Sequence, residues 1–412
     1  MQLWLSMTRF TQKYRNMSLQ RDYLKELNDI KNGFPIIGVV WARQVGKTTF
    51  LKEQFPNYKY FNLESPEVLS DIVNNTWWFL RENSHIIIDE IQKHPIIFNY
   101  LLEIVDTRQI MADFIISGSE NLILSEKISQ SLAWRVWYIK MEPFSFSELQ
   151  KYNLLSDDFV EQIFKWFMPI IYDRDISPIK YYEQYIATYI ERDVRQIKDI
   201  QNLWLFHKFL TLLAGRIGQM INYQSLANDV WVEEKTIKRW LSVLEASYIV
   251  YTLCPYYENF GKRYIKSPKI YFTDTWVACR LLWIKSTEEL KNSYMIWNLF
   301  ENMIVSEIRK QINILWTRDG TFFYRDSHQK EIDLIIDKAL TQIPIEIKSS
   351  GTYSTDFAKW IKYRKELNRW NIKKHPEKWY IIYTWQDMWH DEDFDIINWK
   401  NFQYREIMDI PS

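Results

Sequence analysis

Cysteine and long apolar runs are scarce in this chain. Its 412 residues include two cysteines, Cys254 and Cys279, which are too few for a disulfide framework and do not form a zinc pattern. No run of about 20 apolar residues is present, so we expect no membrane span. Arg9, Lys13 and Arg15 are not followed by the apolar core of a signal peptide. We therefore expect a cytoplasmic protein that does not bind membranes.

The chain also lacks an excess of charge of either sign. Lysine and arginine together number 52, and aspartate and glutamate together number 52. This balance excludes the global basic field that attracts nucleic acid, so any such contact must be local. The length predicts about two to four domains.

Glycine is rare, whereas tryptophan is abundant. The chain has 9 glycines and 20 tryptophans, although average usage of about 7% predicts roughly 29 glycines. Trp231 falls in the turn of a helix–turn–helix pattern, where glycine is frequent, and Trp134 falls in a polar loop. One hypothesis is that many of these tryptophans are glycine codons read with the wrong genetic code, since UGA encodes Trp in some codes and Gly in others. The alternative is real tryptophans in a diverged protein.

A phosphate-binding loop is indicated after the apolar residues 34–40. The segment reads as GxxxxGK(S/T) with Trp41 in place of the first glycine, between an expected strand and an expected helix. Backbone N–H groups of such a loop cradle phosphate, Lys47 reaches the outer phosphates and Thr48 ligates Mg²⁺. We expect strain at Trp41, because the position suits a glycine with positive φ. The expected nucleotide-binding residues are Trp41, Ala42, Arg43, Gln44, Val45, Gly46, Lys47, Thr48 and Thr49.

Two further segments fit an ATPase site. Residues 86–90 form an apolar strand ending in Asp89, expected to hold Mg²⁺ through its water shell, and Glu90, expected to polarise the attacking water. The alternative is a strand followed by a helix-capping acid. Ser119 follows another apolar strand, where ligands of open α/β sheets bind. It could sense the terminal phosphate or cap the next segment.

A winged helix is predicted near residues 206–270. Ser225 begins a helix–turn–helix, and residues 248–271 could form a two-stranded wing. Such a module would place its second helix in the DNA major groove and its wing on phosphates. The alternative is a lid or protein-contact module of the same fold. The expected basic face consists of Lys235, Lys238, Arg239, Lys262, Arg263 and Lys266.

The C-terminal third carries a second constellation of charged residues. Glu346 and Lys348 lie two apart on an expected strand and therefore share a face. With Asp333 on a preceding strand, they resemble the PD-(D/E)xK nuclease core. The resemblance implies that Asp333 and Glu346 bind Mg²⁺ together with Glu301, the matching helix acid, and that Lys348 steadies or activates the hydrolytic water. Surface charges on strands are the alternative.

Several strings along the chain resemble bacterial and archaeal AAA+-type ATPases that carry a C-terminal domain of unknown function. The resemblance implies an AAA+-like core and ATP as the ligand. It also makes Arg135 an arginine-finger candidate, within one subunit or across a homo-oligomer interface, with a surface salt bridge as the alternative. The strings are residues 42–49, 87–92, 116–119, 131–135, 143–148 and 189–194, and the family typically has glycine at the positions of Trp41, Trp134, Trp276, Trp283 and Trp297.

The predicted architecture is α/β. It combines an AAA+-like P-loop domain with a three-layer core (1–155), a helical connector (156–205), a winged helix (206–272) and a nuclease-like α/β domain (273–412). We expect an ATPase that uses ATP and Mg²⁺ and couples hydrolysis to a nucleic-acid or protein partner. The alternatives are an ATP-gated metal-dependent nuclease and a nucleotide-regulated binding module with little turnover.

Overall fold

The computed structural model separates the chain into two compact units. Unit 1 comprises described residues within Met1–Glu148, Phe167–Tyr181 and Ser242–Ile249, and unit 2 comprises those within Leu149–Trp166, Tyr182–Leu241 and Val250–Ser412. The structure describes residues 19–119, 132, 134–165, 167–173, 178–188, 202–257, 267–315, 317, 320–325, 331–338, 341–348, 378–384, 389–390 and 394–407. Within these residues, no helix is both long enough and apolar enough to cross a membrane.

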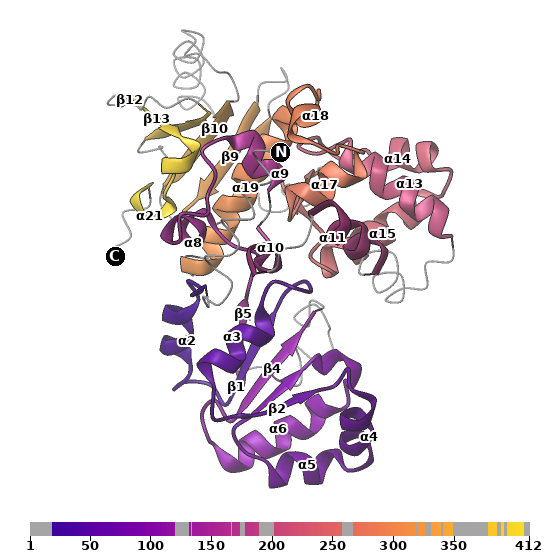
Figure 1. The fold of residues 1–412 in the computed structure, drawn as a ribbon, viewed down its shortest axis with the longest axis vertical. Coiled ribbons are helices and arrows are strands. Elements are labelled where there is room, and N and C mark those ends of the chain that lie inside the picture. Colours follow the sequence, from indigo (N-terminus) through magenta and orange to yellow (C-terminus); the bar gives the residue numbers. More distant parts are fainter. Residues whose placement is uncertain are drawn as a thin grey trace. The chain divides into compact units, whose positions relative to one another are not determined.

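Unit 1 is built on a five-stranded parallel sheet (Figure 1). The strand order is β2-β3-β4-β1-β5, so β4 lies between β1 and β3 and pairs with both in parallel. All five carboxyl ends therefore meet at one edge of the sheet. The strands are β1 (Ile36–Val40), β2 (Lys59–Asn62), β3 (Ile86–Asp89), β4 (Phe114–Gly118) and β5 (Val136–Lys140).

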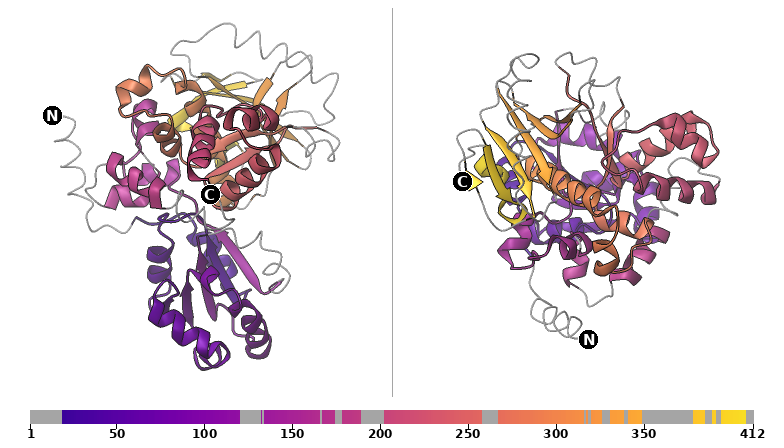
Figure 2. Two further views of the ribbon diagram at one scale, coloured as in Figure 1. Left: turned by 90° about the vertical axis from the view of Figure 1, so that its right-hand side faces the viewer. Right: turned by 90° about the horizontal axis from the view of Figure 1, so that it is seen from above.

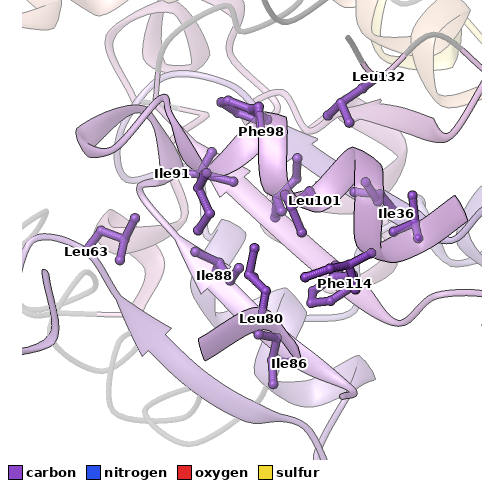
Figure 3. Close-up of a cluster of buried hydrophobic side chains, with 14 of the residues drawn as sticks. Ile36, Leu63, Leu80, Ile86, Ile88, Ile91, Phe98, Leu101, Phe114 and Leu132 are labelled. Carbon is purple, nitrogen blue, oxygen red and sulfur yellow. The ribbon is translucent and has the colours of Figure 1, made fainter. Parts of the chain in front are cut away.

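The central strands of unit 1 are apolar on both faces, as expected for a parallel sheet covered on both sides. Ile36, Ile88 and Phe114 belong to a core that also contains Leu101 and other residues of α6 (Figure 3). The alternate residues of the same strands point to the opposite face because side chains alternate along a strand. The helices are α2 (Leu24–Ile30), α3 (Lys47–Gln54), α4 (Pro66–Asn74), α5 (Thr76–Glu82), the 3₁₀ turn η1 (Ile91–Lys93), α6 (Ile97–Arg108) and α10 (Pro169–Asp173).

Unit 2 begins with helices. Asn202 and Asn222 cap two of them by accepting hydrogen bonds from Leu205 N and Ser225 N. Three further helices, α8 (Phe146–Lys151), α11 (Pro178–Tyr185) and α15 (Glu234–Ala246), have residues in both units. The helices within unit 2 are α9 (Phe159–Phe164), α13 (Leu203–Ala214), α14 (Tyr223–Val230), α17 (Thr275–Leu281), α18 (Thr287–Lys291), α19 (Ile296–Leu315), the 3₁₀ turn η4 (Trp399–Asn401) and α21 (Tyr404–Ile407).

The described part of unit 2 also contains two sheets. β6 (Val250–Leu253) and β7 (Lys269–Phe272) form an antiparallel pair. A six-stranded mixed sheet has the order β12-β13-β11-β10-β9-β8, and the long helix α19 lies against it (Figure 2). Its strands are β8 (Gly320–Arg325), β9 (Glu331–Asp337), β10 (Gln342–Lys348), β11 (Trp379–Tyr383), β12 (Trp389–His390) and β13 (Phe394–Asn398).

Among the described residues, three tryptophans occupy left-handed backbone conformations. Trp134, Trp231 and Trp283 have φ values of 69°, 71° and 62°, and 93%, 76% and 60% of their surfaces are exposed. Trp231 ends α14 at the position where helices commonly carry glycine. Positive φ is costly for a side chain with a Cβ, and exposure leaves little packing to compensate. These three positions therefore suit glycine better than tryptophan. The buried Trp41 and Trp276 do not have positive φ.

Candidate nucleotide site and C-terminal carboxylate cluster

The loop between β1 and α3 has the geometry of a phosphate-binding turn. Gln44 and Gly46 have φ values of 68° and 92°, and α3 begins at Lys47 as predicted. The prediction of strain at Trp41 is wrong, because the residues in left-handed conformations are Gln44 and Gly46, three and five positions later. Instead, the buried Trp41 indole stacks on Tyr248, a residue of the same unit, at a ring distance of 4.1 Å.

Lys47 lies inside this loop. Its Nζ donates to the carbonyl oxygens of Trp41 and Ala42, both at 2.8 Å, and the residue is only 5% exposed. Burial lowers the pKa of Lys47 to about 8, although the charges of Glu90 and Asp89 oppose that shift. The ammonium is thus held by neutral carbonyl oxygens near acids that favour its charged form.

Asp89, at the carboxyl end of β3, accepts hydrogen bonds from three hydroxyl groups. Thr48 Oγ1 donates to its Oδ2 at 2.7 Å, the Tyr60 hydroxyl donates to the same oxygen at 2.6 Å, and Ser117 Oγ donates to Oδ1. Burial alone would raise the pKa of Asp89, but these hydrogen bonds and the charge of Lys47 outweigh burial and lower it. The carboxylate is therefore kept ionised beside the Thr48 hydroxyl. These two oxygen donors fit Mg²⁺, which commonly takes few protein ligands and keeps waters or phosphate oxygens in its other positions.

Glu90 follows Asp89 in a left-handed conformation, with φ of 55°. Its Oε2 accepts a hydrogen bond from Ser119 Oγ at 3.0 Å and another from Gln92 Nε2. Gln92 also donates to Ser119 Oγ at 2.9 Å. The insertion of β4 between β1 and β3 is what places Ser119 beside Glu90. Gln92 had no predicted role, although it lies in one of the strings that resemble the AAA+-type ATPases.

Arg21 stabilises the phosphate-binding loop through a hydrogen bond to its backbone. This role was not predicted. It is 6% exposed, and its Nη1 donates to the carbonyl oxygen of Val45 at 2.7 Å. Its Nε pairs with Glu148 at 2.8 Å, and its Nη2 donates to the Glu142 carbonyl oxygen at 2.5 Å. Arg21 therefore connects the loop to the segment after β5. No sequence motif surrounds it, so only the tertiary structure reveals this contact.

Arg135 lies at the other edge of the sheet. It immediately precedes β5, whereas the phosphate-binding loop follows the carboxyl end of β1. Its guanidinium pairs with both carboxylate oxygens of Asp106, at 2.5 and 2.7 Å. Five strand residues at about 3.3 Å each separate the two edges, so Arg135 does not reach Lys47 of its own loop. This geometry corresponds to the surface salt bridge, and a finger role across an oligomer interface stays a prediction.

In unit 2, the four residues of the predicted nuclease-like constellation converge. Lys348 Nζ pairs with Glu346 Oε1 at 2.5 Å, and Asp333 Oδ2 accepts the backbone N–H of Ile347 at 2.8 Å. Burial, opposed by the charges of Glu346, Asp333 and Glu301, is the main influence on Lys348, and the net effect raises its pKa. The structure therefore brings Glu301, Asp333, Glu346 and Lys348 into one electrostatic cluster.

A metal site at Glu301, Asp333 and Glu346 stays a prediction, and the structure adds a lysine to this cluster. Lys269 of β7, which was not predicted, lies among the carboxylates and pairs with Glu301 Oε1 at 3.0 Å and with Glu331 Oε1 at 2.5 Å. Among the residues described, no group of three or more His, Cys, Asp or Glu side chains is arranged to hold a metal ion. Lys269, Lys348 and the Ile347 N–H group each engage one carboxylate oxygen, of Glu301, Glu346 and Asp333 respectively.

The predicted winged-helix segment has the element order α13, α14, α15, β6 and β7. On α15, Lys238 pairs with Glu234 at 2.5 Å, and Lys235 pairs at 2.8 Å with Glu233, the residue before the helix. These acids reduce the local positive charge of the expected basic face. Lys262, Arg263 and Lys266 lie outside the described residues.

Comparison with protein families supports a P-loop ATPase domain in this chain. Residues 33–150 match the model of an AAA domain, the segment that contains Lys47, Asp89 and Glu90. Residues 156–288 match a domain of unknown function (DUF8612), and residues 298–402 match another (DUF4143).

Two relatives that match most of the chain are described as uncharacterized proteins. An uncharacterized protein of Mycobacterium tuberculosis is 26% identical over 341 residues, covering 81% of this chain and 75% of the relative. An uncharacterized protein of Haemophilus influenzae is 24% identical over 394 residues, covering 85% and 93%.

Two solved structures show weaker likeness. The Walker-type ATPase PABY2304 of Pyrococcus abyssi aligns with a TM-score of 0.41 and 13% identity, covering 64% of this chain and 95% of that chain. The structure of Drosophila ORC bound to AT-rich DNA and Cdc6 aligns with a TM-score of 0.21 and 10% identity, covering 67% and 93%. These scores are too low to establish a shared fold.

Proposed function

We propose that the chain is a Mg²⁺-dependent ATPase. The observation that carries the proposal is the meeting of Lys47, Thr48 and Asp89 at the carboxyl edge of the parallel sheet, joined by the hydrogen bond from Thr48 to Asp89. The ammonium group of Lys47 donates to two neutral carbonyl oxygens. Lys47 can therefore exchange these acceptors for phosphate oxygens without leaving a carboxylate unpaired. Bound Mg²⁺ would neutralise charge on the outer phosphates.

Glu90 is the proposed base that orients the attacking water. Its Oε2 lies 3.0 Å from Ser119 Oγ, so Ser119 can hold the carboxylate in place and respond when a terminal phosphate arrives. Asp89 is kept ionised by its hydroxyl donors and holds the metal side of the site. Tyr60 shares the oxygen that Thr48 contacts, which makes it a positioning residue for Asp89.

Turnover of ATP by the full chain tests this proposal. Glu90→Gln keeps the shape and removes the charge, so we expect ATP binding to persist and turnover to fall by about 10²-fold or more. Glu53→Gln, at an exposed position of α3, is the matched control and should leave turnover unchanged. Turnover that is equal in Glu90→Gln and Glu53→Gln would remove Glu90 from the mechanism.

We further propose that hydrolysis is coupled to a partner, with DNA as one candidate. The support is the winged-helix order of α13 to β7 and the exposure of Lys235 and Lys238, although their pairing with acids weakens the case. Salt-dependent retention of DNA by the full chain, reduced by Lys235→Glu, would support this partner. Retention that is insensitive to both salt and the substitution would favour a protein partner. The boundaries at residues 155, 205 and 272 and a homo-oligomeric state remain predictions.

A further inference from the structure

The carboxylate cluster of unit 2 draws its acids from three elements. Glu301 comes from α19, Glu331 and Asp333 from β9, and Glu346 from β10. Glu346 is only 6% exposed, and burial together with the negative charge of Asp333 raises the pKa of Glu301. Partly buried carboxylates at such close range repel one another, and a nearby cation offsets that repulsion.

Lys269 supplies that cation from β7. The residue is 2% exposed, and its Nζ bridges Glu301 and Glu331, two acids from different elements. Tyr271, two residues along the same strand, donates its hydroxyl to Glu301 Oε1 at 2.6 Å. β7 therefore presents one charged and one neutral donor to the same carboxylate.

A close approach of the backbone fixes Glu301 from another side. Gly218 has φ of 72°, and a Cβ at this position would lie 3.2 Å from Glu301 Oε2. The Glu301 carboxylate thus lies between a glycine, a tyrosine hydroxyl and a lysine ammonium. Such a setting selects one orientation of the carboxylate.

The remaining acids are also engaged. Asp333 accepts the N–H of Ile347, Glu346 pairs with Lys348, and Glu331 faces Arg325 at 3.7 Å. Mg²⁺ requires near-octahedral coordination by about six oxygen atoms. A metal ion bound to Glu301 Oε1 or Glu331 Oε1 would have to displace the ammonium group of Lys269, which already provides the compensating charge there.

We propose that Lys269 is a built-in cation that takes the place of a divalent metal at this carboxylate cluster. The cluster then joins β7, α19 and β9 through ion pairs without a metal ion. Its acids hold no metal-activated water, so this unit acts as a binding or structural module rather than as a metal-dependent nuclease. Removal of the ammonium should open a site for a divalent cation, because the acids would lose their compensating charge.

Mn²⁺ binding measured by electron paramagnetic resonance tests this proposal. The full chain is used without nucleotide and with Asp89→Asn, which removes the metal-side carboxylate of unit 1. We expect no Mn²⁺ uptake by the protein that retains Lys269, and uptake of about one ion after Lys269→Met. Adding Asp333→Asn should abolish that gain. Lys310→Met is the matched control, because Lys310 is also buried but faces Glu307, outside the cluster, at 3.8 Å.

Two results would overturn the proposal. One is Mn²⁺ uptake by the protein that retains Lys269, if Asp333→Asn abolishes it. The other is a folded Lys269→Met protein that takes up no Mn²⁺. If Lys269→Met does not fold, the measurement on the protein with Lys269 decides the question alone. The readout is independent of ATP turnover, so the proposed ATPase and this inference can fail separately.

Discussion

Two buried lysines, one in each unit, are held in opposite ways. Lys47 donates to two backbone carbonyl oxygens, whereas Lys269 pairs with two carboxylates. Burial lowers the pKa of Lys47, and the acids around Lys269 overcome the same effect of burial and raise its pKa. A lysine held by neutral acceptors keeps its charge available for an anion, whereas a lysine held by acids is already neutralised.

This difference in lysine environment explains why two sites with similar residues support different chemistry. Both sites contain a lysine and acids near the ends of strands, and both were expected to bind Mg²⁺. In unit 1 the acid Asp89 is bound by hydroxyl groups, which a metal ion can share or replace. In unit 2 the ammonium group of Lys269 binds Glu301 and Glu331, and that of Lys348 binds Glu346, so a metal ion at those oxygens would have to displace a cation.

Removal of Lys269 should give the largest change in stability. Lys269→Met leaves two partly buried carboxylates without their buried cation, and breaking a buried ion pair by removing one partner costs about 3–5 kcal/mol. Chemical denaturation in the presence of EDTA would measure the loss. Lys291→Met, at an exposed position of α18, should change the free energy of unfolding by less than about 0.5 kcal/mol. A Lys269→Met protein as stable as this control would break the contrast between the two lysines.

The affinity for ATP should depend on pH because of the lowered pKa of Lys47. Lys47 binds phosphate as a cation, and its pKa lies near 8. Affinity for ATP should therefore fall as pH rises above about 8, by roughly tenfold per pH unit at most. Titration of ATP from pH 7 to 9.5 would measure the decline, and a constant affinity over this range would contradict the assigned role.

The same pKa shifts predict opposite trends in stability. Between about pH 8 and 10.5 the unfolded chain keeps the Lys47 proton and the folded chain loses it, so this group makes folding more favourable as pH rises. The raised pKa of Lys269 does the reverse, because its contribution is fully present below the unfolded pKa and is lost as pH rises through the folded pKa. Differences in unfolding free energy between wild type and each Lys→Met variant, measured against pH, should therefore slope in opposite directions. Parallel slopes would show that the two lysines have similar environments.

Substitution of two tryptophans should change the free energy of unfolding by smaller amounts while leaving both lysines in place. Trp231→Gly relieves a positive φ at an exposed helix end and should raise the free energy of unfolding by about 1 kcal/mol. Trp297→Gly, in the first turn of α19, should instead lower it by less than about 1 kcal/mol, since glycine loses more backbone freedom than other residues when a helix forms. Thermal denaturation compares the two, and a loss of stability in Trp231→Gly would argue that the indole belongs there.

The hypothesis of misread codons has a direct test in the intact mass of protein from the native source. A mass equal to that of the printed sequence would exclude the hypothesis. The left-handed conformations of Trp134, Trp231 and Trp283 predict that glycine is present at least at these positions.

Local patterns were sufficient to predict much of unit 1. The apolar runs that become β1, β3 and β4, and the start of α3 at Lys47, were predicted because strand and loop signals are short-range. The α/β class with a parallel sheet is confirmed, and the AAA domain match supports the ATPase core. In unit 2, β9 and β10 were also predicted from alternation and apolar runs.

The residues that complete each site were not predictable in this way. Arg21, Tyr60 and Lys269 lie outside any motif and reach their partners only through tertiary packing. The Lys269 contact depends on where β7 packs against α19, which spacing along the chain does not specify. The wrong prediction of strain at Trp41 has a similar cause. The motif indicates that the loop bends, but it does not indicate which residue adopts positive φ.

Titration of Mg·ATP into Lys47→Met and Lys269→Met, side by side, tests the central contrast most directly. Lys31→Met serves as the control, because Lys31 is exposed and its ammonium group donates to Asn28. Loss of a charged hydrogen-bond donor predicts that Lys47→Met weakens binding by roughly 10- to 100-fold. Lys269→Met, studied under conditions in which it is folded, should bind like the control. Equal affinities in all three proteins would contradict the account, because Lys47 would then not be the lysine that binds phosphate.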